Sequence, residues 1–269
     1  MTRSLRELLK LLRRFYVKID RAFNRLGNER KCYTCGRTFN RFTKYHNGTR
    51  NMPEFRSRLD VVGSDIDNFG CMYCGSHDRE RHLYMFFDKL KLWDTIKNSR
   101  VIHFAPEKNL TGKIKGLEPK EYVLADIRPY NNQIQEVDII NIPFGDSVFD
   151  FVICNHVLEH VKEYKTALKE IHRILSPGGI AILQTPYSKL LKTNFEDENI
   201  STDDLRFFFY GQKDHCRIFS EDNLFTDLKG SGFELRIIKH SDHFNEHESQ
   251  YYGINKKEDL IMLRKPNDS

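Results

Sequence analysis

Apolar residues in the second half of the chain form short continuous runs separated by polar segments. The runs occupy positions 101–104, 122–125, 134–137, 149–155 and 180–185. A strand covered by helices on both faces is continuously hydrophobic rather than alternating, so each run predicts a buried strand. Between the last two runs, Leu168, Ile171 and Leu175 repeat at helical spacing. This alternation predicts an α/β fold with a mostly parallel, doubly wound sheet.

The pattern changes after Pro186. Residues 187–219 are polar and aromatic, and the segment is too long to be a bare connector. Long ordered loops usually carry binding residues, so we expect this insertion to cover a substrate. A helix at 220–229 and strands at 233–239 and 259–264 follow, and we expect the last strand to be antiparallel.

The first 28 residues predict a basic amphipathic helix. Its apolar residues recur at spacings of three and four: Leu5, Leu8, Leu12, Phe15, Ile19 and Phe23. Arginine and lysine occupy the other face, which is the composition of a helix lying on a membrane interface, although packing against the protein explains the stripe equally well. Residues 1–25 are therefore a candidate contact with an anionic membrane, which salt-sensitive pelleting with liposomes would test.

The charge distribution sharpens this picture. The 269 residues carry a net charge of +5, but residues 1–60 hold 16 Lys or Arg against five Asp or Glu, so the remainder is acidic. A basic segment suggests an anionic partner, either nucleic acid or lipid. No apolar run is long enough to span a membrane, and arginine and lysine interrupt the N-terminal leucines, unlike a secretory signal. We expect a cytoplasmic protein, with peripheral attachment at the inner membrane face as an option.

Two matched cysteine pairs follow the basic segment. Cys32 and Cys35, and Cys71 and Cys74, each form a Cys-x-x-Cys-Gly turn. Two such turns complete a closed tetrahedral four-sulfur site, so residues 29–78 predict a small module around a structural Zn²⁺. A helix over 79–98 is expected to bridge to the main domain, and we expect the charged run at its start, 79–82, to be solvated.

Four motifs in the main domain resemble the class I S-adenosylmethionine-dependent methyltransferases. The resemblance covers about residues 99–265, within a domain expected over 99–269. The motifs are the first strand with its turn, Asp126 ending the second strand, the segment from Asp138 through His160, and Arg173-Ile-Leu-Ser-Pro-Gly-Gly179. More narrowly, His103-Phe-Ala-Pro-Glu107, the cysteine turns and Gly211-Gln-Lys-Asp-His215 look like a bacterial subgroup with an N-terminal zinc knuckle.

The resemblance implies a Rossmann-like sheet and a set of cofactor contacts. Asp126 would bind the ribose diol and Asp138 the adenine amino group, with Ile127 and Ile139 flanking the adenine ring. The alternative for both aspartates is a loop-capping role. Three further positions around the first turn and one at the end of the fourth strand complete the expected cofactor contacts: His103, Ala105, Glu107 and Asn155.

One departure concerns the turn after the first strand. The family usually has glycines there, which let the backbone approach the cofactor. Here Ala105, Glu107 and Asn109 stand in those places. Because the methionine end of the cofactor carries an ammonium, Glu107 is suited to bind that cation.

Histidines supply the candidate bases. His156 follows the fourth strand, and Asp214 and His215 on the insertion are the alternative. His156-Val-Leu-Glu159-His160 also matches a zinc-protease pattern, but that pattern requires a helix, whereas here a buried strand runs into it. We therefore expect a methyltransferase acting on an O or N nucleophile of a small molecule or glycan. The alternatives are an RNA methyltransferase and a non-catalytic binding protein.

Overall fold

The computed structural model of the protein describes residue 19 and residues 22–267. The predicted basic helix and its membrane contact at residues 1–25 lie almost entirely outside the described residues. Within the described part, no helix is long and apolar enough to cross a membrane.

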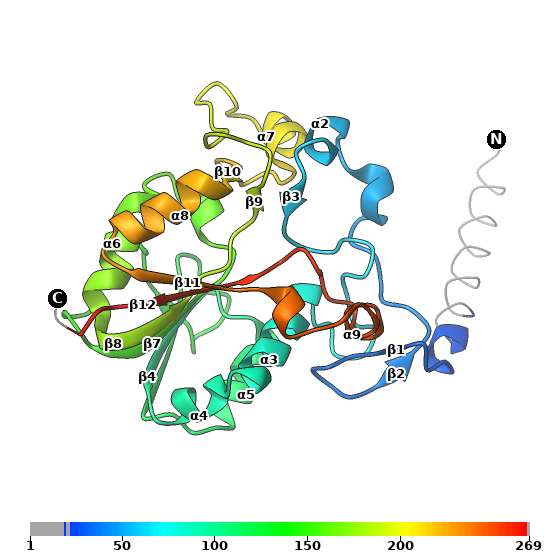
Figure 1. Ribbon diagram of the computed structural model, residues 1–269, viewed down its shortest axis with the longest axis horizontal. Coiled ribbons are helices and arrows are strands. Elements are labelled where there is room, and N and C mark those ends of the chain that lie inside the picture. The colour runs from blue at the N-terminus through cyan, green and yellow to red at the C-terminus, as the bar shows by residue number, and fades with distance from the viewer. Residues whose placement is uncertain (1–18, 20–21, 268–269) are drawn as a thin grey trace.

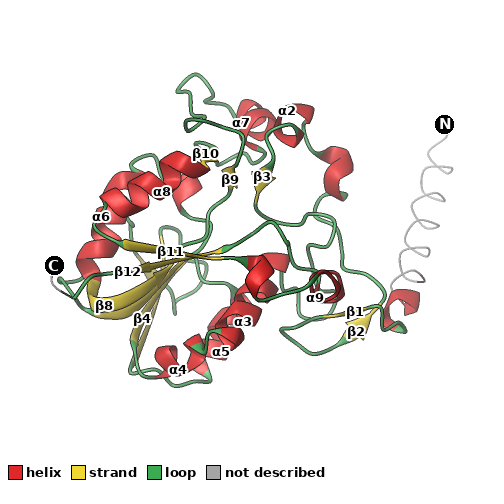
Figure 2. Ribbon diagram, viewed as in Figure 1, coloured by secondary structure: helices red, strands yellow, loops and turns green. Residues whose placement is uncertain are grey.

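A seven-stranded sheet forms the centre of the molecule (Figure 2). Its order is β11-β12-β8-β7-β4-β5-β6. The strands are β4 (Arg100–Phe104), β5 (Glu121–Asp126), β6 (Gln135–Glu136), β7 (Phe149–Cys154), β8 (Leu175–Ile182), β11 (Glu234–Ile238) and β12 (Leu260–Arg264). Only β12 runs antiparallel to its neighbours β8 and β11. The predicted mostly parallel sheet with an antiparallel last strand is therefore confirmed.

Helices cover both faces of the sheet (Figure 1). One face carries α3 (Asp78–Lys89), α4 (Leu92–Lys97) and α5 (Lys108–Lys115), and the other carries α6 (Tyr164–Ile174) and α8 (Glu221–Gly230). Successive strand residues point to opposite faces of the sheet. Phe151 and Ile153 therefore pack in the core beneath α3, α4 and α5, while Val152 and Cys154 pack in the core beneath α6 and α8. Both faces are buried, which explains the continuous apolar runs.

Strand β8 begins earlier than predicted. The apolar run predicts a strand from residue 180, but β8 begins at Leu175, which already pairs with Phe149. The pairing shifts register opposite Phe149 and Phe151, and Gly178 adopts a left-handed φ of 74°. The proline and glycines therefore form an irregularity within the strand instead of a separate turn.

The insertion packs against the segment between the two cysteine turns. Strands β3 (Val61–Val62), β9 (Tyr187–Ser188) and β10 (Phe219–Ser220) form a small sheet in the order β10-β9-β3. Beside it, Phe55 of α2 (Glu54–Ser57) contacts Phe208 and Phe209 of α7 (Asp203–Tyr210). Figure 1 shows α2 and α7 together above the main sheet.

The cysteine turns lie against the helical face and the C-terminal segment. The first turn, with Cys32 and Cys35, connects β1 (Arg30–Lys31) to β2 (Thr38–Phe39), and the two strands form an antiparallel hairpin. Tyr33 donates a hydrogen bond to Asp88 of α3 at 2.6 Å and packs edge-on against Tyr252 of α9 (Glu246–Tyr252). Three short 3₁₀ turns complete the described elements: η1 (Gly48–Asn51), η2 (Leu158–His160) and η3 (His240–Asp242).

Candidate active site

The strand order reverses between β4 and β7, which makes their carboxyl ends the expected ligand site. From β4 the chain continues to β5 on one side, while β7 and β8 lie on the other. Open α/β sheets bind ligands in the crevice at this point. Ala105 directly follows β4, and Asn155 and His156 follow β7. The structure therefore brings the two segments together.

After β4 and after β7, the chain leaves the sheet through a residue in the left-handed backbone conformation. Ala105 has a φ of 47° and His156 a φ of 55°. This conformation costs a non-glycine residue free energy and is concentrated at functional sites. Ala105 thus adopts the backbone conformation that the family's glycine would supply, and the amide of Ala105 donates to the Ala125 carbonyl at 2.9 Å.

Two buried polar residues, His103 and Asn155, hold the carboxylate of Glu107. His103 Nε2 lies 2.6 Å from Glu107 Oε2, and His103 Nδ1 lies 2.9 Å from the Tyr122 hydroxyl. Asn155 donates to Glu107 Oε1 at 3.3 Å. Burial by itself would raise the pKa of Glu107, but the hydrogen bond and charge of His103 outweigh it and hold that pKa below its usual range. Glu107 is therefore an anion at the edge of the site, and the fully buried His103 supports it from behind.

The two candidate aspartates lie on adjoining turns. The amide of Val137, next to Asp138, donates to the carbonyl of Asp126 at 3.0 Å. Asp126 Oδ1 accepts the Arg128 amide at 2.8 Å, and Asp138 Oδ1 accepts the Ile140 amide at 3.1 Å. Each carboxylate thus caps its own turn, and such a cap does not occupy the whole carboxylate.

The two isoleucines expected to flank an adenine ring have different environments. Ile127 is 60% exposed, whereas Ile139 is 5% exposed and packs into the core beneath the sheet edge. Ile127 is therefore free to lie against a ring, while Ile139 offers only the small part of its surface that remains accessible.

His156 lies among polar side chains directly after β7. Its Nδ1 lies 3.3 Å from Glu159 Oε1, and its Nε2 lies 3.9 Å from Glu258 Oε1. The Nε2 atom is buried and has no hydrogen-bond partner within the described residues. An imidazole nitrogen without a hydrogen-bond partner is suited to bind or deprotonate a ligand.

The alternative base candidates come close to the same segment. The amide of Cys216 donates to the Glu159 carbonyl at 2.8 Å, which brings His215 beside η2. His215 is 2% exposed, and burial lowers its pKa to about 4. The Asp214 carboxylate is 72% exposed and lies 3.4 Å from His160 Nδ1.

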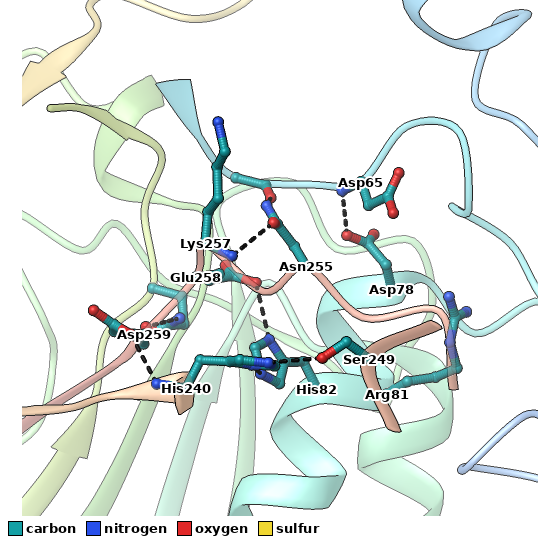
Figure 3. A network of polar contacts seen from close by, with 12 residues as sticks. Asp65, Asp78, Arg81, His82, His240, Ser249, Asn255, Lys257, Glu258 and Asp259 are labelled. Carbon is teal, nitrogen blue, oxygen red and sulfur yellow. Dashed lines mark hydrogen bonds and ion pairs between the residues drawn. The ribbon is translucent and has the colours of Figure 1, made fainter. Parts of the chain in front are cut away.

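Glu258 is a site residue that the sequence reasoning missed. It is buried in the loop before β12 and contacts His82 Nδ1 at 3.5 Å in addition to His156. Figure 3 shows this contact within a polar network that continues from His240 to Ser249. Because β12 is antiparallel, its start lies at the carboxyl edge of the parallel strands, so the predicted strand direction would have pointed to Glu258.

The prediction that residues 79–82 are solvated was wrong. Glu80, Arg81 and His82 are all buried, and only Arg79 in this run is partly exposed. Glu80 accepts the amide of Leu110 at 2.8 Å and so holds the start of α5. Helix starts are commonly charged and exposed, but here the cysteine turns and the C-terminal segment cover this one.

The four cysteines of the two turns converge as predicted from their spacing. The Sγ atoms of Cys32 and Cys74 are 3.7 Å apart, and those of Cys35 and Cys71 are 3.9 Å apart. Zn–S bonds of about 2.3 Å in a tetrahedron place the sulfurs about 3.8 Å from one another. The cluster therefore has the dimensions that a zinc ion requires.

The sheet order and the residue range of this fold agree with a methyltransferase domain. The methyltransferase-domain family matches residues 74–237, and the chain belongs to it. Among curated relatives, demethylmenaquinone methyltransferase of Staphylococcus epidermidis is 34% identical over 76 residues, which is 26% of this chain. The protein of that name from Staphylococcus carnosus is 40% identical over 52 residues, or 19% of this chain. The matches span only 32% and 22% of those relatives' length.

Solved structures of similar fold are more distant in sequence. The YcgJ protein of Bacillus subtilis is 15% identical, with 69% of this chain and 99% of that chain covered and a TM-score of 0.47. An S-adenosylmethionine-dependent methyltransferase from Mesorhizobium loti is 12% identical, with 66% and 100% covered and a TM-score of 0.46.

Proposed function

We propose that the protein transfers a methyl group from S-adenosylmethionine to an oxygen or nitrogen of a small molecule or glycan. The observation that carries this proposal is the buried Nε2 of His156, which has no hydrogen-bond partner among the described residues and lies at the carboxyl end of β7, beside the reversal of strand order. The similarity to demethylmenaquinone methyltransferases, which act on a small molecule, supports that acceptor class over RNA.

The cofactor would lie across the ends of β4, β5 and β7. Asp126 would accept the ribose hydroxyls and Asp138 the adenine amino group, with Ile127 and the accessible part of Ile139 against the ring. Glu107 would bind the ammonium. The left-handed turn at Ala105 and the amide of Asn155 would lie along the rest of the cofactor. His103 would hold Glu107 in place.

The chain's contribution to the reaction would be alignment and proton removal. The bound cofactor supplies an electrophilic methyl group, and attack along the line of the breaking bond depends on positioning. His156 Nε2 would take the proton from the attacking hydroxyl or amine. Glu159, bonded to Nδ1, would orient the ring and stabilise the imidazolium that forms. Asp214 and His215 would shape the acceptor side from the insertion.

The four cysteines would hold a structural Zn²⁺. Their Sγ separations match a tetrahedral four-thiolate site, and all four positions are occupied by protein, which leaves none for chemistry. This module would extend over residues 29–78 and lead through the helices at 79–98 to the methyltransferase domain at 99–269, as in the zinc-knuckle subgroup that the sequence resembles.

Calorimetry with S-adenosylmethionine tests the cofactor site. Asp126→Ala should weaken binding at least tenfold, because a lost charge-assisted hydrogen bond costs about 1.5–3 kcal/mol. Asp94→Ala is the matched control, since Asp94 is an exposed aspartate of α4, away from this edge. No binding at millimolar cofactor, or equal binding by wild type and Asp126→Ala, would refute the assignment.

Transfer of labelled methyl from S-adenosylmethionine to a panel of phenols, quinols, amines, glycans and RNA tests the acceptor class. His156→Asn should lower the rate by about 10²–10⁴-fold with little change in cofactor affinity. Labelling of RNA alone would overturn the small-molecule proposal.

A further inference from the structure

Three side chains on the insertion side of the site converge without belonging to the cofactor contacts. Glu159 and His160 come from η2, and His215 comes from the insertion 55 residues later in the chain. One possible ligand atom from each lies within 4.8 Å of those of the other two. Glu159 and His215 are buried, and His160 is partly exposed. Two imidazoles and a carboxylate are a common ligand set for divalent transition metals.

Glu159 is an unusual charge to bury. Glu159 is 1% exposed, and no lysine or arginine forms an ion pair with it in the described part of the chain. Thr185 donates to Oε2 at 2.8 Å, and His156 Nδ1 lies 3.3 Å from Oε1. A buried carboxylate normally has a compensating cation or binds a metal. The two hydrogen bonds fix the orientation of the carboxylate but provide no permanent positive charge.

The two histidines are oriented as metal ligands usually are. His160 Nδ1 lies 3.3 Å from the Asp214 carbonyl and 3.4 Å from its carboxylate, so its Nε2 is the nitrogen left to bind. A metal-binding histidine almost always donates its other N–H to such an oxygen. His215 Nε2 is buried and has no hydrogen-bond partner in the described structure. The two rings meet edge to face, with centroids 4.7 Å apart.

We propose that Glu159, His160 and His215 bind a divalent transition-metal ion, with Zn²⁺ as the expected occupant. Ligand atoms at about 2.1 Å from zinc lie roughly 3.4 Å from one another, so the side chains need to close by little more than ~1 Å. Asp214, Thr185 and His156 would orient the ligands. Three protein ligands leave a coordination position open, as in catalytic rather than structural zinc sites. The site is distinct from the four-cysteine cluster and does not depend on the proposed acceptor.

Titration of the full-length protein with Zn²⁺, after the cysteine site has been filled, tests the proposal by calorimetry. One further equivalent should bind. His160→Gln and His215→Gln should each weaken it at least 100-fold, and Asp214→Asn by about tenfold, the usual effect of a residue that orients a ligand. Cys35→Ser should retain this equivalent while losing the other.

The exposed His247 gives the matched control, because His247→Gln removes an imidazole elsewhere on the surface and should leave the titration unchanged. Circular dichroism identifies a histidine variant that fails to fold. In that case Asp214→Asn decides, since the carboxylate of Asp214 is 72% exposed. Absence of a second equivalent at millimolar Zn²⁺, or unchanged affinity in Asp214→Asn and the folded histidine variants, would overturn the proposal.

Discussion

At the scale of single residues, the site is built from side chains held in costly states. Ala105 and His156 adopt left-handed backbone conformations, Glu159 is a buried carboxylate, and the Nε2 of His156 has no hydrogen-bond partner among the described residues. Strain and unpaired polar atoms of this kind persist only where the surrounding structure compensates for them. They mark this edge of the sheet more clearly than any one motif does.

Asp78 gives a pH-dependent prediction at this scale. Burial raises the pKa of its carboxyl to about 7, and its Oδ1 has no hydrogen-bond partner within the described structure. From about pH 4 to 7 the unfolded chain loses this proton while the folded chain retains it. The stability contributed by the protonated form is therefore lost as pH rises, by ~1.4 kcal/mol per unit and about 4 kcal/mol in all.

Asp78→Asn removes this titration and should become progressively more stable than wild type between pH 4 and 7. Urea unfolding of both proteins across this range measures the difference. Asp94→Asn, at an exposed position, should show a constant difference from wild type. A difference in unfolding free energy between Asp78→Asn and wild type that stays constant with pH would contradict the raised pKa of Asp78.

At the scale of elements, α3 joins three parts of the chain through Arg81. All five N–H groups of its guanidinium donate to backbone carbonyls, which belong to Asn68, Phe69, Ser76, Tyr252 and Gly253. The guanidinium also lies 3.8 Å from the centre of the Phe42 ring. One side chain thus connects the cysteine turns, α3 and the end of α9.

Arg81→Lys should therefore destabilise the protein by about 2–6 kcal/mol. A lysine offers three donors, so at least two buried carbonyls lose their partners, at roughly 1–3 kcal/mol each. Chemical denaturation measures the loss. Arg100→Lys is the control, because Arg100 pairs with Asp150 at a partly exposed position and should cost less than ~1 kcal/mol. Equal losses in the two variants would show that the carbonyl contacts do not stabilise this junction.

At the scale of the whole molecule, residues 29–78 pack against the helices, the insertion and the C-terminal segment that surround the methyltransferase sheet. The cysteine turns lie on α3 and α9, while the segment between them pairs with the insertion through β3 and β9. Lys257 also donates to Asp60, and Asn255 contacts the Gly63 carbonyl near the site. Loosening the cysteine cluster should consequently affect regions well beyond it.

At this scale, we predict what happens when the metal proposed for the cysteine cluster is lost. Cys35→Ser should lose one equivalent of zinc and make residues 29–78 sensitive to protease before the sheet is cut, because structural zinc contributes directly to folding. Limited proteolysis and zinc analysis measure both effects. Cys154→Ala, in the core beneath the site, should keep that equivalent of zinc. Full zinc content in Cys35→Ser would rule out the four-thiolate site.

Much of the architecture follows from local patterns in the chain. The apolar runs at 101–104, 122–125 and 149–155 correspond to β4, β5 and β7, and the helical spacing after Tyr164 corresponds to α6. These predictions succeed because burial on both faces of a sheet, or on one face of a helix, is recorded in residues close together in the sequence. The candidate positions after β4, β5 and β7 follow from the same reasoning.

Contacts between distant segments could not be predicted in this way. The charged run at 79–82 is buried because carbonyls from residues 68–76 and 252–253 surround Arg81, and Glu258 reaches His156 from a loop about 100 residues away. The grouping of Glu159 with His215 likewise depends on how the insertion returns to β7. A polar residue's sequence neighbours do not reveal which groups will remove it from water, because those groups arrive only when the chain folds.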